Sequence, residues 1–408
     1  MSGVPISAFT ETVRLTGPTV FTGVRDVIND AQKTNYNTLG YLMRGQQMSD
    51  VVQGGIQIVD DIYLSSVRKA RTYRPGQKQS YTNPQTGTQL AAPWRMFITD
   101  ITWDDTEREL NEGAGRAGDR SLRYKDIWFK KQMNSYSDWC DFMEEQYWIG
   151  GDPSRMEAAN GDLMYSIPYL INEFASGLVG DGNPSGVVAT TKLGINPTGA
   201  GLTNWDNQRF AYSNTNTGTS MNGNSLLAQL KNAFQKLDFR PPPMKGEYFE
   251  AAAAKPVNWI ACSSNAKNFI WIQYMASQNR WDNQMDPYGN PVFDGSPFVY
   301  IAALDGAQIY PTGSNEAIVT ANWGTEGNTA NSGVNNAGPR YYLINSEYLK
   351  HIFHSKFTMS NLGVMDDRAQ PTSHTMPLLT WCNLFPRSLR RHAIVYPSGG
   401  SVSGYPST

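Results

Sequence analysis

The feature that constrains this fold most is an uninterrupted stretch from Ser121 to Ile149, which contains no glycine and no proline. Its apolar residues recur in alternate steps of four and three, so they fall on one face of an α-helix. Those residues are Phe129, Met133, Tyr136, Cys140, Met143 and Tyr147. At 1.5 Å per residue the helix would be roughly 43 Å long. We predict that this face packs against strands of the same domain as its core.

The residues around this stretch support the same prediction. Gly150, Gly151 and Pro153 follow it directly and would end the helix. Its tryptophans lie off the apolar face, so we expect a second face to be covered too; they are Trp128, Trp139 and Trp148. A helix of this length is longer than usual in globular proteins. Both an ordinary core helix and a scaffold for something larger fit the pattern.

A second unusual feature is the polar segment from Thr72 to Trp94, which holds three prolines and two glycines. It lies between residues 54–73 and 94–109, where apolar and polar residues alternate. These two stretches predict the strands of one β-hairpin. Hairpin loops usually have about two to five residues, so this hairpin would carry a projecting finger at its tip. The finger has little to bury in its own chain, and we therefore expect it to have a partner.

The N-terminal region, residues 1–50, is polar and mixed, with a weak helical pattern near Val24 to Tyr36. We interpret it as an extended arm, which also needs a partner to lie on. It contains no basic stretch followed by an apolar run, and the chain has no run of 18 apolar residues. Neither a secretory signal nor a membrane helix is therefore expected. We expect a protein that is made in the cytoplasm and is soluble there.

Composition limits the classes of function. Of 408 residues, 40% are hydrophobic and 12% aromatic, which is enough for packed cores. The 34 basic and 36 acidic residues leave a net charge of −2, so no bulk attraction to nucleic acid or to an anionic membrane follows. Cys140, Cys262 and Cys382 are far apart in the chain. This favours buried thiols in a reducing compartment over a disulfide framework or a zinc cluster.

The central part of the chain predicts an α+β domain. Residues 180–223 and 312–338 are dense in Gly, Asn and Thr, which is typical of surface insertions. Between and after them the pattern predicts helices at 225–238 and 264–278 and strands at 256–263, 297–304, 339–353 and 375–397. No internal repeat is present.

Catalytic and metal motifs are weak. The acidic run of Asp104, Asp105, Glu107 and Glu109 follows a predicted strand, where a solvated face is the usual meaning. The spacing of Asp282, Asp286 and Asp294 is not that of an EF-hand loop. His351 and His354 would suit a zinc pair only on a helix, and no third ligand accompanies them.

Two further motifs also fall short. The stretch GDGNPSG lacks the lysine of a phosphate loop, and no nucleophile-elbow pattern is present. We therefore expect no enzyme activity, no cofactor and no metal.

The order of these elements resembles the tailed-bacteriophage major capsid protein of the HK97-like fold. Three stretches carry the resemblance locally: PVNWIACSSNAKNFIWIQYMASQ, NPVFDGSPFVYIAALDG and YYLINSEYLKHIFHSKF. The first is similar to a strand and helix of that family, the second to its strand after a turn, and the third to its late strand. The resemblance covers most of the chain but rests on order and pattern.

The resemblance implies an α+β capsid fold with a defined division of the chain. It implies an N-terminal arm (1–50), an extended hairpin called the E-loop with flanking strands (51–103), and a peripheral domain with a long spine helix (104–155). An axial domain with Gly/Asn-rich insertions (156–340), return strands of both domains (341–396) and a C-terminal tail (397–408) follow.

The resemblance also implies a function. The chain would self-assemble as hexamers and pentamers into the icosahedral head shell of a tailed phage. The shell would enclose double-stranded DNA without sequence-specific binding. A portal protein, and scaffolding or decoration proteins, would be partners; the location would be the virion. The E-loop tip would contact a neighbouring subunit through Arg74, Gln77, Lys78, Tyr81, Gln85 and Gln89.

In some members of that family a lysine at this place forms an isopeptide bond with an asparagine of another subunit. Here Lys78 is the only lysine of the finger, and Asn361 and Asn383 lie in the late strands. No acidic residue can be assigned to either asparagine, although Asp366 and Asp367 are near in sequence. We predict no cross-link.

Two other functions remain open at this point. One is another virion component, such as a portal or tail protein. The other is a carbohydrate-active enzyme or binding domain, because 11 Trp and 21 Tyr could stack on sugar rings and paired carboxylates could hydrolyse them.

Overall fold

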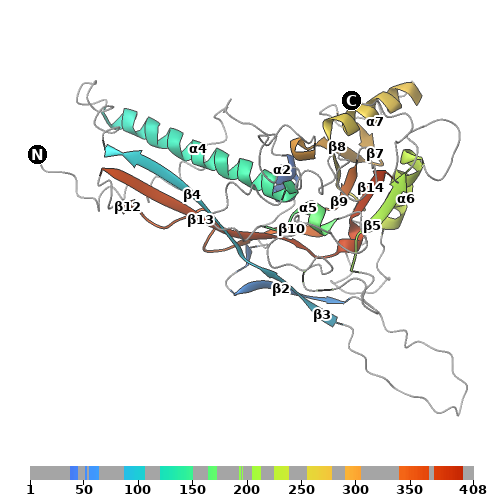
Figure 1. Cartoon of the computed structure of the whole chain (residues 1–408), viewed down its shortest axis with the longest axis horizontal. Helices are drawn as coiled ribbons and strands as arrows, with labels where there is room; N and C mark the ends of the chain where they lie inside the picture. Colours follow the sequence, from blue (N-terminus) through green and yellow to red (C-terminus); the bar gives the residue numbers. More distant parts are fainter. Residues whose placement is uncertain are drawn as a thin grey trace, which may run out of the picture.

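The described part of the computed structural model comprises residues 37–44, 51–52, 55–63, 87–105, 120–149, 164–171, 193, 195, 205–212, 225–238, 255–277, 290–304, 340–366 and 372–397. Within these ranges the chain builds two six-stranded sheets and one two-stranded sheet, together with helices that cover them (Figure 1). The chain is therefore mixed α+β, as predicted.

The long helix α4 spans Arg120–Ile149, which confirms the helix predicted for residues 121–149. Figure 1 shows α4 lying along β4 and β13 of the first sheet. Polar contacts fix it there, because the Ser135 hydroxyl donates to the Asp100 carbonyl at 3.1 Å and Lys131 Nζ donates to the Thr102 carbonyl at 2.9 Å. Phe142 of the helix meets Phe97 of β4 edge to face, with ring centroids 5.2 Å apart.

The first sheet has β13 at its centre, with β4 along one edge and β10, β11 and β12 along the other. The strands are β1 (Val51–Val52), β4 (Arg95–Asp104), β10 (Leu349–His354), β11 (Ser360–Asn361), β12 (Met365–Asp366) and β13 (Ser373–Pro386). β4 pairs with β13 in antiparallel register along its whole length. Only β1 joins its neighbour, β10, in parallel.

The second sheet lies beside the far end of α4 and carries α6 and α7 (Figure 1). Its strands, in spatial order, are β5 (Gln208–Tyr212), β14 (Ala393–Pro397), β9 (Tyr341–Ile344), β6 (Trp259–Cys262), β8 (Ser296–Tyr300) and β7 (Val292–Phe293). α7 (Ser264–Ser277) follows β6 in the chain, and β6 pairs with β8 in parallel. α6 (Leu226–Leu237) begins at Ser225, whose hydroxyl accepts from the Ala228 amide at 3.3 Å.

The structure thus confirms the helices predicted at 225–238 and 264–278, and a strand within each of the late segments. Periodicity and turn chemistry were sufficient there, because α6 buries one amphipathic face and β6 and β9 are short apolar runs buried along their whole length. The Asp294–Gly295 turn between β7 and β8 has positive φ at both residues, 46° and 80°. Such a turn favours the Asp-Gly pair found in the sequence.

The hairpin differs from its prediction. β2 (Gln57–Tyr63) pairs with β3 (Gly87–Pro93), which lies inside the segment interpreted as finger. The predicted return strand, residues 94–109, instead supplies β4, which leaves the hairpin for the first sheet. The alternation of polar and apolar residues correctly indicated a strand but could not identify its partner. Residues 64–86, which hold most of the predicted finger, lie outside the described part.

The predicted arm also differs where it is described. Residues Asn37–Arg44 form helix α2, which packs within the chain and is not extended. Leu42 of this helix is fully buried. The weak helical pattern at 24–36 and the rest of the arm before residue 37 lie outside the described residues.

The predicted insertion at 180–223 contains a core strand, β5. Its five residues include Phe210 and Tyr212, which are buried beneath α6. β5 pairs in parallel with β14, the strand closest to the C-terminus among those described. A short strand with a partner so far along the chain gives no local signal, and the insertion prediction was wrong at this point.

Two large apolar clusters form the core. One lies between α4 and the first sheet and continues to the inner face of the second sheet, and the other lies beneath α6 and α7. Short elements complete the junction: α5 (Ile167–Leu170), η5 (Ala302–Leu304) and η6 (Leu389–Arg391). Among the described helices, none combines the length and apolar character needed to cross a membrane.

Candidate assembly surfaces

The predicted tip of the hairpin is described at one residue only. Gln89 lies on β3, exposed, directly opposite Asp61 of β2. The remaining predicted contact residues lie outside the described part; they are Arg74, Gln77, Lys78, Tyr81 and Gln85. The hairpin base is held by Trp94, whose indole N–H donates to the Gly55 carbonyl at 3.1 Å.

The predicted core face of α4 is graded along its length. Cys140, Met143 and Tyr147 are buried, whereas Met133 and Tyr136 are half-buried. The side chain of Phe129 is outside the described part. The face therefore enters the core toward the C-terminal end of the helix, where it meets both sheets.

The second face of α4 is covered as well at its described tryptophans. Trp139 and Trp148 are buried at 5% and 1% exposure. Trp148 meets Tyr342 of the second sheet edge to face. Burial raises the pKa of the Cys140 thiol to about 11 and that of Cys382 well above its ordinary value. Both thiols are therefore neutral and unsuited to nucleophilic chemistry.

Part of the outward face of the first sheet carries exposed apolar side chains, which the sequence pattern did not single out. Phe97 of β4 points at α4, so its neighbours Met96 and Ile98 point to the opposite face. They are 58% and 60% exposed. Across the sheet they stand opposite Trp381 and Leu379 of β13. The sequence of Arg95–Asp104 could have predicted this exposed apolar surface, because that strand carries apolar residues on both of its faces.

Other exposed aliphatic side chains lie elsewhere in the first sheet and on the hairpin. Met365 of β12 and Leu362 just before it are 53% and 46% exposed. On the hairpin, Val59 is 43% exposed, and Ile56 at its base is 94% exposed. Large exposed apolar surfaces on a soluble protein commonly mark contacts with other proteins. We name Met96, Ile98, Leu362 and Met365 the outer sheet surface.

The aromatic side chains pack against one another instead of forming an exposed platform. Trp381 stacks on Phe357 at 4.3 Å, and Trp94 meets His354 at 5.3 Å between ring centroids. Within the described residues, every large hydrophobic side chain that is exposed is aliphatic.

The two histidines considered as a zinc pair lie on β10, a strand, where positions three apart face opposite sides. His351 contacts Tyr147 of α4, whereas His354 contacts Trp381 on the other face. No group of three or more His, Cys, Asp or Glu side chains that could hold a metal occurs in the described ranges.

Two of the described acidic candidates contact basic side chains. Asp105 Oδ2 lies 3.2 Å from His374 Nε2 at the distal tip of β4 and β13. Asp294 accepts from Lys231 of α6 at 2.6 Å. Both pairs tie neighbouring elements together at the surface.

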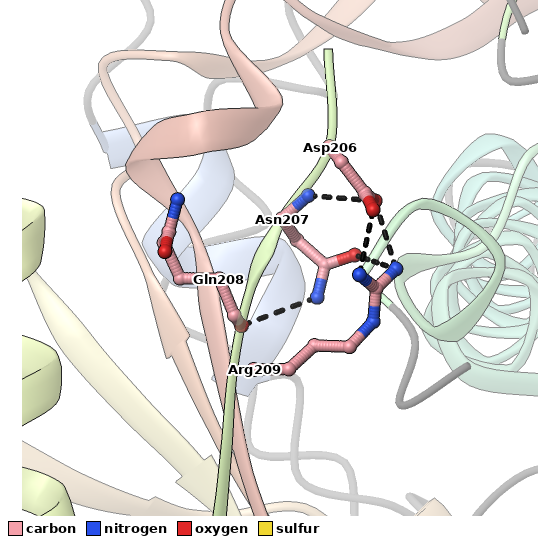
Figure 2. Close-up of polar contacts among 4 residues, drawn as sticks. All are labelled: Asp206, Asn207, Gln208 and Arg209. Carbon is pink, nitrogen blue, oxygen red and sulfur yellow. Dashed lines mark hydrogen bonds and ion pairs between the residues drawn. The ribbon is translucent and has the colours of Figure 1, made fainter. Parts of the chain in front are cut away.

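The most compact polar cluster lies at the start of β5. Figure 2 shows Arg209 directed back at Asp206, to which it donates two hydrogen bonds of 2.6 and 2.8 Å, and at the Asn207 side-chain oxygen at 3.4 Å. The Asp206 carboxylate also accepts from the Asn207 amide at 2.9 Å. The arginine neutralises the carboxylate, and the cluster contains neither a nucleophile nor a free base. These contacts stabilise the backbone at the start of β5.

Two buried histidines are equally unsuited to acid–base work. Burial lowers the pKa of His351 to about 3, and burial is also the first cause that lowers the pKa of His392 to about 3. Both are fully buried and neutral. The Asn345 amide donates to His392 Nδ1 at 3.2 Å, which ties the second sheet to its last strand.

No protein-family model matches this chain, and no curated protein does either. Among solved structures, the chain is similar to the capsid asymmetric unit of cyanophage A-1(L), with a TM-score of 0.52 and 13% identity over 91% of this chain and 95% of that chain. The chain adopts a phage capsid fold.

This phage capsid fold also has weaker neighbours. The mature capsid of bacteriophage PhiM1 matches with a TM-score of 0.43 and 10% identity over 86% of this chain and 85% of that chain. The SrpI encapsulin from Synechococcus elongatus matches with a TM-score of 0.40 and 8% identity over 100% of this chain and 99% of that chain.

Proposed function

We propose that this chain is the major capsid protein of a tailed double-stranded DNA phage, with an HK97-like fold, and that it self-assembles into the icosahedral head shell. The observation that carries the proposal is the likeness to a cyanophage capsid over 91% of this chain. The role is structural and not enzymatic. The neutral or ion-paired state of the described candidate residues supports this.

The proposed domains follow the two sheets. α4 and the first sheet make the peripheral domain, with α4 as the spine helix. The second sheet with α6 and α7 makes the axial domain. The hairpin of β2 and β3 is the base of the E-loop, and the late strands β9 to β14 return to both domains. The proposed boundaries follow the sequence prediction with two changes. α2 (residues 37–44) docks within the chain instead of belonging to an extended arm, and β4 (residues 95–104) belongs to the peripheral domain instead of the E-loop segment.

The proposed subunit contact joins two surfaces of different copies. The E-loop tip, from Arg74 to Gln89, lies over the outer sheet surface of a neighbouring subunit. That surface is exposed and aliphatic in the isolated chain, and burial of such a surface on association is favourable at about 25 cal/mol per Å². A thin shell needs lateral overlap of this kind because each subunit offers only narrow edges.

The proposed partners follow from the shell. Copies of the chain form hexamers and pentamers, a portal protein occupies one vertex, and scaffolding or decoration proteins assist assembly. The net charge of −2 suits a wall that encloses DNA without binding its sequence. The location is the virion, after synthesis in the host cytoplasm.

Electron microscopy of the full chain after expression tests the proposal. Closed isometric shells of uniform diameter are the expected result. Rings or tubes would instead indicate a portal or tail protein, and a stable monomer that acts on a glycan would overturn the structural role.

A further inference from the structure

A carboxylate lies buried between α2 and α4 in the core. Glu144 of α4 is 4% exposed. Its two carboxylate oxygens accept from the first backbone amides of α2, Thr38 N at 3.0 Å and Leu39 N at 2.9 Å. Among the described residues no cation contacts it. Helix N-termini leave such amides without partners inside the helix, and a residue over a hundred positions away supplies the acceptor here.

Two side-chain hydrogen bonds also hold the first turn of α2 against α4. The Trp148 indole N–H donates to the Thr38 hydroxyl at 2.7 Å, and that hydroxyl also hydrogen-bonds the Glu144 carboxylate. Trp148 and Thr38 are both buried. The start of α2 is thus held by hydrogen bonds to two residues at the C-terminal end of α4, Glu144 and Trp148.

The same helix also contacts the second sheet. The Asn37 side-chain amide donates to the Tyr300 carbonyl at the end of β8, at 2.7 Å. Tyr41 stacks on Trp259 of β6, with centroids 5.1 Å apart. α2 therefore contacts both α4, which lies on the first sheet, and the second sheet. It is also the first element of the chain that the structure describes.

We propose that α2 is a releasable latch docked at the junction of the two sheets, and that protonation of Glu144 sets how tightly it docks, with tighter docking in acid. The inference concerns the folded subunit and does not depend on the proposed shell function.

The direction follows from the environment of the carboxylate. Burial raises the pKa of Glu144, and the hydrogen bonds from Thr38 and Leu39 oppose the shift without reversing it. When α2 leaves, the carboxylate regains water and its pKa falls toward the ordinary value. The docked state therefore binds the proton more tightly, so docking strengthens as pH falls. Above the raised pKa the ionised carboxylate is buried without a counter-charge, and the latch is weaker.

The neighbouring titratable groups do not supply that counter-charge. On α4 itself, Cys140, Asp141 and Tyr147 are neutral or negative. From β10, His351 bonds Tyr147 and is neutral because burial lowers its pKa to about 3. The one charged residue of α2, Arg44, stands at the opposite end of that helix from Thr38 and Leu39.

Hydrogen exchange of the full chain, read by mass spectrometry, tests the latch. Peptides covering residues 37–44 are followed between about pH 5 and about pH 8, after correction for the intrinsic exchange rate. Linkage to one proton changes the opening equilibrium by at most about tenfold per pH unit. We expect opening of α2 to increase several-fold toward high pH, whereas opening of β13 should not increase in that direction.

Two variants separate this mechanism from a general effect of pH. Glu144→Gln cannot ionise, so its α2 opening should be independent of pH. Asp138→Asn removes an exposed charge from the same helix and should keep the parent's pH dependence. A flat profile in the parent, or the parent's slope in Glu144→Gln, would overturn the proposal. If Glu144→Gln does not fold, Thr38→Ala, which removes the hydroxyl bond but keeps the carboxylate, should raise opening at every pH.

Discussion

The hydroxyl of Tyr147 and Nδ1 of His351 lie 2.5 Å apart in the core, where they join α4 to β10. Both residues are fully buried. The ring of His351 also lies 4.1 Å from that of Phe353. This contact places a neutral imidazole at the centre of the proposed peripheral domain, and it makes the domain sensitive to acid.

Acid should destabilise the subunit through His351 and His392. Their pKa values are lowered to about 3 in the folded state, so below the ordinary histidine value the unfolded chain binds protons that the folded chain does not. Each should remove about 1.4 kcal/mol of stability between about pH 7.5 and about pH 5.5, with the loss ending near the folded pKa. Urea unfolding at the two pH values measures this. His351→Gln should lose its share of the pH dependence, and an unchanged dependence would contradict the assignment.

The grading of the α4 core predicts unequal effects of truncation. Met143 is fully buried, so Met143→Ala should lower the free energy of unfolding by about 2–5 kcal/mol. Met133 is half-buried, and Met133→Ala should cost clearly less because water reaches the site. Chemical denaturation of both variants makes the comparison. Equal losses would mean that the helix is buried uniformly.

Removal of the hairpin tip should separate folding from assembly. Replacing residues 66–84 by a short Gly/Ser linker keeps β2 and β3, including the buried Leu90. We expect a subunit with the parent's circular dichroism spectrum that forms no closed shells by electron microscopy. Normal particles would remove the E-loop from the assembly proposal.

Charges on the outer sheet surface should have the same selective effect. Met96→Asp and Ile98→Asp place a carboxylate on an exposed face, so the melting temperature should change little while shell formation is lost. Asn134→Asp, on an exposed position of α4, adds the same charge elsewhere and should assemble. Sedimentation velocity distinguishes free subunits from shells. Shells from the Met96→Asp variant would exclude this surface as a subunit contact.

We predict shells without covalent cross-links. Asn383 is buried and its side chain is occupied, since Oδ1 accepts from the Tyr165 and Leu384 amides and Nδ2 donates to the Pro93 carbonyl. Asn361 is exposed, but its Nδ2 donates to Met376 Sδ and its Oδ1 accepts from the Gly363 amide. Denaturing electrophoresis of shells should give one band near 45.4 kDa. A ladder that disappears in Lys78→Ala would reverse this prediction.

The sequence by itself determined the elements whose stability is local. The steps of four and three between Phe129 and Tyr147 describe one helix face, and those residues lie within a few turns of one another. α6 and α7 were predictable for the same reason. The Asp294–Gly295 turn was readable because its backbone conformation favours those residue types.

Only the tertiary structure decided which strands pair. β4 lies next to β3 in the chain, yet it pairs with β13 from Ser373 onward, and alternation of polar and apolar residues is the same whichever partner a strand has. β5 and α2 were missed because their order comes from distant partners, β14 for the strand and Glu144 for the helix. The outer sheet surface was hidden for a related reason. An apolar side chain on β4 has the same composition in a core and on an assembly face, and only the position of α4 distinguishes the two.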